Sequence, residues 1–234
     1  MCELHRLGLL GGMTWQSTAS YYRLLNEAVH DRVGGSASAP VTIHSVDFGD
    51  FEPRQRAGDW AGQGRILAEA AAALQAGGAE TIALATNTLH LVADQIRAAI
   101  TVPFVDLVDV VAEAVAEYAT VGLLATNYTM TSDMYPKRMA DFGTQVIVPE
   151  AAEREIVHNV IYDELQVGVI SERSREAYRA IMAGLVARGA EAIVLACTEI
   201  GLLVDDSDAS VPVYDTTALH CAVLTDYMIP GALA

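Results

Sequence analysis

The sequence has 234 residues, of which 52% are hydrophobic and 19% are charged. Disordered chains show the opposite balance, so this composition predicts one large folded domain or two smaller ones. The formal net charge of −16 would repel phosphate backbones and anionic lipids. We therefore expect a protein that binds neither nucleic acid nor a membrane surface.

The cysteine count and the first residues predict a cytoplasmic protein. Cys2, Cys197 and Cys221 form an odd, sparse set, which is not a disulfide framework and is typical of a reducing compartment. The apolar run at 7–13 is too short and too glycine-rich for a secretory signal. No membrane-spanning helix is expected either, because Glu199 interrupts the longest apolar run.

Short apolar runs alternate with segments of helical period along the first half of the chain. Strands are expected at 7–10, 41–46 and 81–85, and helices from about 14 or 17, over 63–77 and over 94–100. Strands separated by helices indicate βαβ units, whose parallel sheets are covered by helices on both faces.

Three segments of the chain recur in the same order at nearly constant offsets. Residues 8–10, 78–86 and 102–106 recur as 122–124, 189–197 and 211–215. The packing rules of strands and helices can also generate such echoes. The repeat nevertheless predicts two pseudo-symmetric α/β domains, each a mainly parallel sheet flanked by helices. The first would contain 1–118 plus about 217–234, and the second 119–216.

Thr86 and Cys197 occupy equivalent positions in this repeat, directly after a buried strand, where open α/β sheets place ligands. If the two domains face each other, both side chains reach one inter-domain cleft from opposite sides. A helix beginning behind Cys197 would favour the thiolate, which can act as a nucleophile or as a base toward a carbon acid. The alternative is an inert buried cysteine. Cys2 and Cys221 are expected to be structural or incidental.

Other polar residues follow the expected strands. Asn87 and Thr88 can cap a helix or donate to an anion, and Thr126 and Thr129 offer the same two interpretations in the second domain. His90 either packs in the core or orients a neighbour. No metal site is expected, because the six histidines are isolated and no Cys-x-x-Cys is present. The acidic cluster at 205–208 is expected to be a solvated loop.

The motifs at 8–15, 21–22, 86–90 and 197–203 resemble those of the cofactor-independent aspartate/glutamate racemase superfamily. The resemblance spans nearly the whole chain. It implies two pseudo-symmetric α/β domains with the active site between them. It also implies an amino-acid substrate, a homodimer, and a reaction that uses neither pyridoxal phosphate nor a metal.

Most members of that superfamily carry a cysteine in each domain, and this sequence departs from the pattern at Thr86. It thus resembles the L-aspartate/glutamate-specific branch, which pairs one threonine with one cysteine. A hydroxyl is a far weaker acid than a thiol, so Cys197 is expected to remove the α-proton of the L enantiomer. Thr86, or water relayed by it, would then reprotonate the opposite face, and conversion from L to D would be favoured.

The resemblance also implies a set of substrate contacts. The α-carboxylate would be bound by Asn87, Thr88 and Thr198 with help from Thr126 and Thr129, Met13 and Gln55 would line the cleft, and Glu199 and His90 would support the site. Arg54 and Arg56 flank Gln55 and make an arginine available to a side-chain carboxylate. The segment 163–166 lacks the lysine of some aspartate-specific members, so a broader substrate range stays open.

Three alternative functions stay open at the level of sequence. A single-cysteine arylmalonate decarboxylase or a hydantoin racemase would share the fold and the thiol. A two-lobed small-molecule sensor would share the fold alone, and it would not require a thiol at Cys197.

Overall fold

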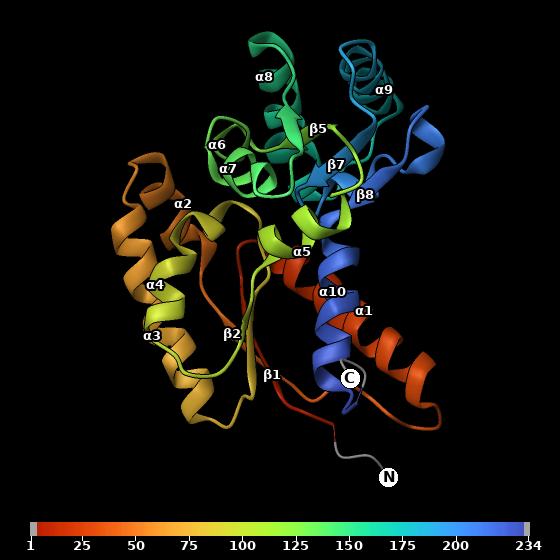
Figure 1. Ribbon diagram of the computed structural model, residues 1–234. Coiled ribbons are helices and arrows are strands. Elements are labelled where there is room, and N and C mark those ends of the chain that lie inside the picture. Colours follow the sequence, from red (N-terminus) through yellow and green to blue (C-terminus); the bar gives the residue numbers. More distant parts are fainter. Residues whose placement is uncertain (1–3, 232–234) are drawn as a thin grey trace. The chain divides into compact units, whose positions relative to one another are not determined.

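The computed structural model describes residues 4–231, which form two compact units (Figure 1). The first unit contains the chain up to Leu107 and again from His220 onward, and the second contains Val108–Leu219. Each unit holds one four-stranded sheet, as the repeat predicts. Among residues 4–231, no helix combines the length and the hydropathy that a membrane crossing requires.

The first unit alternates strands and helices. Its elements are β1 (Leu7–Gly11), α1 (Trp15–Val33), β2 (Val41–Ser45), α2 (Phe48–Arg56), α3 (Trp60–Ala76), β3 (Thr81–Leu84), the 3-10 helix η1 (Thr88–Val92), α4 (Ala93–Ala98) and β4 (Phe104–Val105), with part of α10 (Thr216–Met228). The expected strands and helices are confirmed. The helix predicted at 63–77 begins earlier, at Trp60, because the Asp59 side chain caps it by accepting from Gly62 N.

The strands of the first unit are all parallel, in the order β2-β1-β3-β4. Figure 1 shows this sheet with α3 and α4 on one side and α1 and α10 on the other. Every residue of β1 is buried, as expected for a central strand covered on both faces. The core includes Leu10, Leu67, Ile82 and Leu84, which are fully buried.

The second unit repeats this arrangement. Its elements are α5 (Leu107–Ala114), β5 (Thr120–Ala125), α6 (Asn127–Met130), α7 (Met134–Ala140), β6 (Gln145–Ile147), α8 (Ala151–Asn159), the π-helix η2 (Val160–Glu164), the 3-10 helices η3 (Leu165–Val167), η4 (Ile200–Leu202) and η5 (Asp206–Asp208), α9 (Glu172–Ala187), β7 (Ala192–Ala196), β8 (Val213–Asp215) and the first turn of α10. The parallel sheet has the order β6-β5-β7-β8.

The registers of the two sheets confirm the repeat residue by residue. Gly8 lies opposite Ile82 in the first sheet, and Gly122 lies opposite Ile193 in the second. A Cβ on Gly8 would lie 2.6 Å from Ile82 Cδ1, and one on Gly122 would lie 2.8 Å from Ile193 Cδ1. Glycine is required at both positions because an isoleucine from the neighbouring strand fills the space of a side chain.

Candidate active site

The first unit brings the ends of β1 and β3 together at one edge of its sheet. Ala85 N donates to Leu10 O at 2.8 Å, so the residues that follow the two strands are neighbours. Gly12 N donates to Thr18 Oγ1 at 2.8 Å, and Ser17 Oγ donates to Ala85 O at 3.0 Å. These bonds hold the start of α1 against the residue that precedes Thr86. Thr86 itself is 8% exposed.

His90 orients the backbone of Thr86. Its Nδ1 lies 2.8 Å from Thr86 O, and its Nε2 accepts from Leu107 N–H at 3.2 Å. Because an amide N–H can only donate, Nε2 carries no proton, and Nδ1–H is the group that donates to Thr86 O. Of the two interpretations of His90 made from the sequence, the structure supports the one in which it positions a neighbour.

Asn87 and Thr88 begin a short 3-10 helix rather than an α-helix. Both residues are buried, and the Asn87 side chain makes no capping hydrogen bond to η1. The interpretation of Asn87 as a simple helix cap is therefore wrong. Its role in binding a carboxylate stays a prediction.

Four further residues named from the sequence belong to the first unit, three of them on α2 and Met13 between β1 and α1. Met13 and Gln55 are buried, and Met13 packs in the hydrophobic core. Arg54 forms an ion pair with Asp59 at 3.1 Å, and Arg56 pairs with Glu52. Both arginines thus already have carboxylate partners on the surface, where such pairs contribute little free energy. A substrate carboxylate would have to compete with these partners.

The second unit brings the ends of β5 and β7 together in the same way. Ala125 lies opposite Ala196, so Thr126 and Cys197 follow adjacent positions of two paired strands. Thr126 Oγ1 caps α6 by accepting from Thr129 N at 3.4 Å, and the two hydroxyls are 3.3 Å apart. The capping interpretation of Thr126 is confirmed, and its hydroxyl lies at the same sheet edge as the thiol.

Glu199 contacts the Cys197 thiol directly. Cys197 Sγ donates to Glu199 Oε2 at 3.0 Å, and Thr198 Oγ1 donates to the same oxygen at 2.7 Å. Cys197 and Glu199 are buried, at 8% and 4% exposure. The carboxylate of Glu199 is therefore positioned to accept the thiol proton.

The expected stabilisation of the Cys197 thiolate is not found. Burial raises the pKa of the Cys197 thiol well above its usual range, and the Glu199 carboxylate raises it further. The chain behind Cys197 forms only the three-residue helix η4, not an α-helix with a dipole of useful size. The resting group is a neutral thiol that donates a hydrogen bond to Glu199.

Two residues near Cys197 were not selected from the sequence. Asp215 begins α10 by accepting from Thr217 N at 2.7 Å, and its charge also raises the pKa of the Cys197 thiol. The third repeated segment, 211–215, ends at Asp215, and this repeat was the signal that could have identified the residue. Tyr178 is fully buried and donates to Val157 O at 2.9 Å. Burial raises the pKa of Tyr178, and Cys197 adds to this effect.

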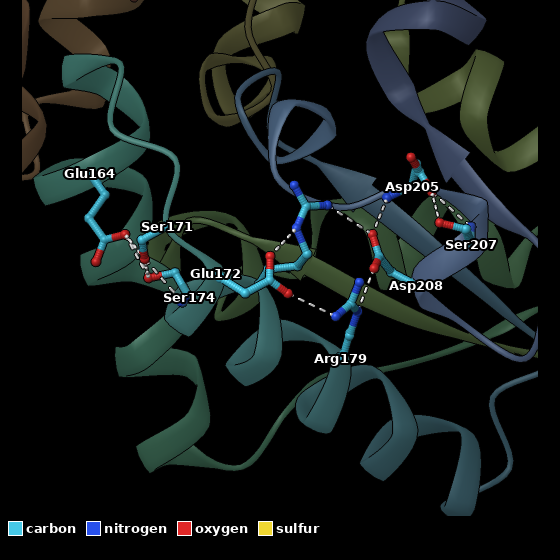
Figure 2. A network of polar contacts seen from close by, with 9 residues as sticks. Glu164, Ser171, Glu172, Ser174, Arg179, Asp205, Ser207 and Asp208 are labelled. Carbon is cyan, nitrogen blue, oxygen red and sulfur yellow. Dashed lines mark hydrogen bonds and ion pairs between the residues drawn. The ribbon is translucent and has the colours of Figure 1, made fainter.

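The acidic cluster at 205–208 is part of a polar network (Figure 2). Asp208 is buried and accepts from Arg179 Nε at 2.5 Å, and Arg175 Nη1 lies 3.4 Å from its other oxygen. Burial opposes ionisation of Asp208, but the Asp205 N–H and the Arg179 guanidinium lower its pKa. The expectation of a solvated loop is wrong for Asp208, because α9 supplies two arginines to it.

The predicted residues fall into two sets. Thr86, Asn87, Thr88, His90, Met13 and Gln55 belong to the first unit, and Thr126, Thr129, Cys197, Thr198 and Glu199 belong to the second. The meeting of the two sets across a cleft stays a prediction. Over residues 4–231, no group of three or more His, Cys, Asp or Glu side chains could hold a metal ion.

A family model and two solved structures that match the chain all describe racemases or racemase homologues. A family model described as Asp/Glu/hydantoin racemase matches residues 10–224. A crystal structure of a candidate Asp/Glu racemase from Yersinia pestis is 44% identical, covers 98% of this chain and 100% of its own, and superimposes with a TM-score of 0.90. An aspartate racemase homologue from Pyrococcus horikoshii OT3 is 35% identical, covers 94% and 97% of the two chains, and has a TM-score of 0.82.

A curated relative gives a shorter match. A 144-residue segment, 58% of this chain, is 32% identical to the glutamate racemase of Herpetosiphon aurantiacus. The match covers 54% of that protein, so it spans about half of the relative's length.

Proposed function

The chain belongs to the Asp/Glu/hydantoin racemase family, and from this premise we propose that it is an amino-acid racemase that acts on aspartate or glutamate without a cofactor. The observation that carries the proposal is the Cys197 thiol, which donates to Glu199 directly after β7. Its counterpart in the repeat is Thr86, directly after β3.

The lysine content of the chain supports chemistry without pyridoxal phosphate. That cofactor is held as a Schiff base by a lysine. The 234-residue sequence contains a single lysine, Lys137. Lys137 lies on α7, where its ammonium pairs with Asp133 and its side chain is 76% exposed. An exposed, ion-paired lysine on a helix surface does not fit a Schiff-base site.

In the proposed mechanism, the thiol is activated only in the complex. The ammonium group of an amino acid beside Cys197 would offset the Glu199 charge that now disfavours the thiolate. Glu199 takes the thiol proton, and the thiolate then removes the proton from Cα of the L enantiomer. Buried N–H and hydroxyl donors after β3, β5 and β7 bind the substrate carboxylates and stabilise the carbanion.

Reprotonation on the opposite face is assigned to Thr86 or to a water bound by it. The hydroxyl delivers its proton to Cα and recovers one from water, while Glu199 and Cys197 return the first proton to solvent. Because a hydroxyl is a poor base at neutral pH, removal of a proton from the D enantiomer by Thr86 would be slow. At saturating substrate, conversion from L to D is therefore the faster direction, whereas kcat/KM is equal in the two directions because the free enantiomers have the same free energy.

Exchange of the α-proton with solvent deuterium tests the proposal. The chain is incubated in D₂O with L-aspartate, L-glutamate and a panel of other L-amino acids. The products are separated on a chiral column, and their molecular masses are measured by mass spectrometry. Deuterium at Cα together with the D enantiomer is expected. Cys197→Ser should abolish exchange, and Cys221→Ser, a change at the other described free cysteine, should preserve it.

The same assay separates the alternatives once an arylmalonate and a hydantoin are added as substrates. A decarboxylase would release CO₂ from an arylmalonate and exchange no amino acid. A hydantoin racemase would exchange only the cyclic substrate. A sensor would bind an amino acid, in the parent and in Cys197→Ser alike, without exchange. Absence of exchange with both aspartate and glutamate would contradict the proposal.

A further inference from the structure

His158 on α8 binds the first peptide N–H of α6. Asn127 N donates to His158 Nδ1 at 3.2 Å, and α6 and α8 contact each other within the second unit (Figure 1). The first four N–H groups of a helix have no acceptor inside the helix. His158 therefore supplies, from another element, the acceptor that α6 itself lacks for Asn127 N.

The peptide group that His158 binds lies between Thr126 and Asn127. Its carbonyl, Thr126 O, accepts from Thr129 N at 3.0 Å, and Thr126 Oγ1 accepts from the same N–H at 3.4 Å. Asn127 O in turn accepts from Thr131 N at 3.0 Å and from Thr131 Oγ1 at 2.7 Å. Both sides of Asn127 are thus hydrogen-bonded. The position of the Thr126 hydroxyl depends on a peptide group that His158 binds.

The His158 ring is itself fixed by its surroundings. Its centroid lies 4.6 Å from that of the Tyr162 ring and 5.8 Å from that of Tyr128, which contacts it edge to face. The end of α8 is anchored from α9, because the Tyr178 hydroxyl donates to Val157 O at 2.9 Å. These contacts keep Nδ1 directed at the start of α6.

The hydrogen bond to α6 requires a neutral imidazole. An amide N–H can only donate, so Nδ1 carries no proton and the neutral ring carries its proton on Nε2. Burial lowers the pKa of His158, and the Asp163 carboxylate acts in the opposite direction. The ring is therefore neutral at pH 7. Protonation would place a second N–H donor opposite Asn127 N and replace an attraction by a repulsion.

Titratable groups reach His158 from the elements that pack against the end of α8. The π-helix η2 contributes Asp163 and Tyr162, α6 contributes Tyr128, and α9 contributes Tyr178 through Val157. Strand β5 carries no titratable side chain. On α8 itself, Arg154 and Glu155 lie one turn earlier and have opposite charges. Asp163 is thus the group whose charge favours the protonated ring.

We propose that neutral His158 is a positioning residue, which holds the peptide group between Thr126 and Asn127 in the geometry that the substrate carboxylate requires. The inference rests on the proposed function, which assigns the Thr126 and Thr129 hydroxyls to that carboxylate. Protonation of His158 releases the peptide group and weakens substrate binding. The thiol site after β7 keeps its own contacts, so the rate of proton transfer in the bound complex does not depend on His158.

Replacement of His158 by asparagine separates hydrogen bonding from protonation. The amide oxygen of His158→Asn can take the position of Nδ1 and accept from Asn127 N, but it does not titrate. KM and kcat for L-aspartate and L-glutamate are measured by chiral chromatography. In the parent, KM should rise about three- to tenfold relative to His158→Asn as the pH falls from about 8 to 5, which corresponds to the loss of one hydrogen bond. The ratio of the two kcat values should stay constant, because the carboxylate is bound alike in the ground state and the transition state.

Three further variants fix the origin of the pH profile. His158→Leu offers no acceptor, so its KM should be raised by the same factor at every pH. Asp163→Asn removes the charge that favours the protonated ring, so the midpoint of the KM profile should move to lower pH. His30→Asn makes the matched substitution at an exposed position of α1 and should keep the parent profile. Circular dichroism at each pH establishes that the variants are folded.

Nuclear magnetic resonance supplies a readout that needs no turnover. The Asn127 amide resonance of the substrate-free chain should titrate with the same midpoint as the His158 ring. By linkage, a saturating mixture of the two enantiomers should lower the pKa of His158 by the logarithm of the factor found for KM. A histidine with a structural role alone would keep its pKa when the substrate binds.

The outcomes distinguish this inference from the proposed function. An active parent whose KM ratio to His158→Asn stays flat with pH would overturn the role of His158 and leave the racemase proposal standing. So would an Asn127 amide that does not respond to the ring, or a pH effect confined to kcat. A folded parent that racemises neither amino acid would overturn the proposed function, and this inference with it.

Discussion

At the scale of single residues, burial and the Glu199 carboxylate together keep Cys197 protonated. The thiol donates to its carboxylate at 3.0 Å, and the two groups share a buried site. One carboxylate thus has two opposite effects. It adds to the effect of burial in keeping the resting thiol neutral, and in the proposed mechanism it accepts the thiol proton.

Glu199→Gln should separate these two effects. Without the negative charge the pKa of Cys197 falls, so alkylation of Cys197 by iodoacetamide, followed by mass spectrometry, should begin at a lower pH. Racemisation should fall by about 10²–10⁴-fold, because the proton acceptor is lost. Glu191→Gln, a change at an exposed carboxylate after α9, is the control. An unchanged alkylation profile would contradict this account of the site.

Thr86→Cys should change the direction preference of the enzyme. A thiol at this position can lose its proton far more readily than a hydroxyl, so it can serve as a base for the D enantiomer. At saturating substrate, initial rates from D-aspartate or D-glutamate should rise by roughly tenfold or more relative to those from the L form. Polarimetry or chiral chromatography measures both directions, and an unaltered ratio would remove Thr86 from the proposed mechanism.

At the scale of elements, two glycines that each precede a leucine in the sequence have opposite structural roles. Gly122 lies in β5 against Ile193 and Leu185, whereas a Cβ on Gly184 in α9 would have only Glu153 Oε1 nearby, at 3.8 Å. Gly122→Ala should lower the free energy of unfolding by about 1–3 kcal/mol through overpacking. Gly184→Ala should raise it by about 0.5–1 kcal/mol through helix propensity. Urea denaturation measures both, and equal signs would refute the packing argument.

His220 connects α1, β4 and α10. Its Nε2–H donates to Val105 O at 3.0 Å, and Nδ1 accepts from the Tyr21 hydroxyl at 2.9 Å. Burial, with a contribution from His90, lowers the pKa of His220 to about 3. In the unfolded chain the value is about 6.5, so between these values the unfolded state binds a proton that the folded state does not.

The unfolding free energy should therefore fall as the pH falls below about 6.5, by up to 1.4 kcal/mol per pH unit from this residue alone. His220→Gln should reduce that slope by the amount that corresponds to the uptake of close to one proton on unfolding. This holds whatever the substitution does to the unfolding free energy at a single pH. Denaturation between about pH 4 and 7 measures the slope. His30→Gln, at an exposed position of α1, is the histidine substitution with which the slope of His220→Gln is compared.

At the scale of the whole molecule, the net charge of −16 predicts self-repulsion in the folded chain. Raising the salt concentration at pH 8 from about 10 to 150 mM shortens the screening length from about 30 to 8 Å and should raise the Tm. Near the sequence pI of about 4.6 the same change should have little effect. Calorimetry in NaCl tests this. A Tm that falls when salt is added at pH 8 would show that attractive ion pairs outweigh the repulsion.

How much of the site could be predicted from the sequence depended on how far apart the interacting residues are along the chain. The repeat pointed to Thr86 and Cys197 because buried parallel strands leave a strong apolar pattern and their ends share a sheet edge. The acidity of Cys197 was predicted wrongly, because it depends on burial and on the side chain of Glu199. Asp208 was misplaced for the same reason, since its arginine partners lie on α9, about 30 residues away in sequence.

The amino-acid pattern by itself determined the α/β class, the parallel sheets and their internal duplication. These features follow from local periodicity and from glycines that are required because a side chain of the adjacent strand fills the space of a Cβ. Both signals can be read along the chain. Only the tertiary structure decided that Cys197 rests as a thiol against Glu199, that His90 orients Thr86, and that His158 accepts from the first N–H of α6. Each of these depends on side chains or strands distant in sequence, whose contacts set burial, proton position and hydrogen bonding.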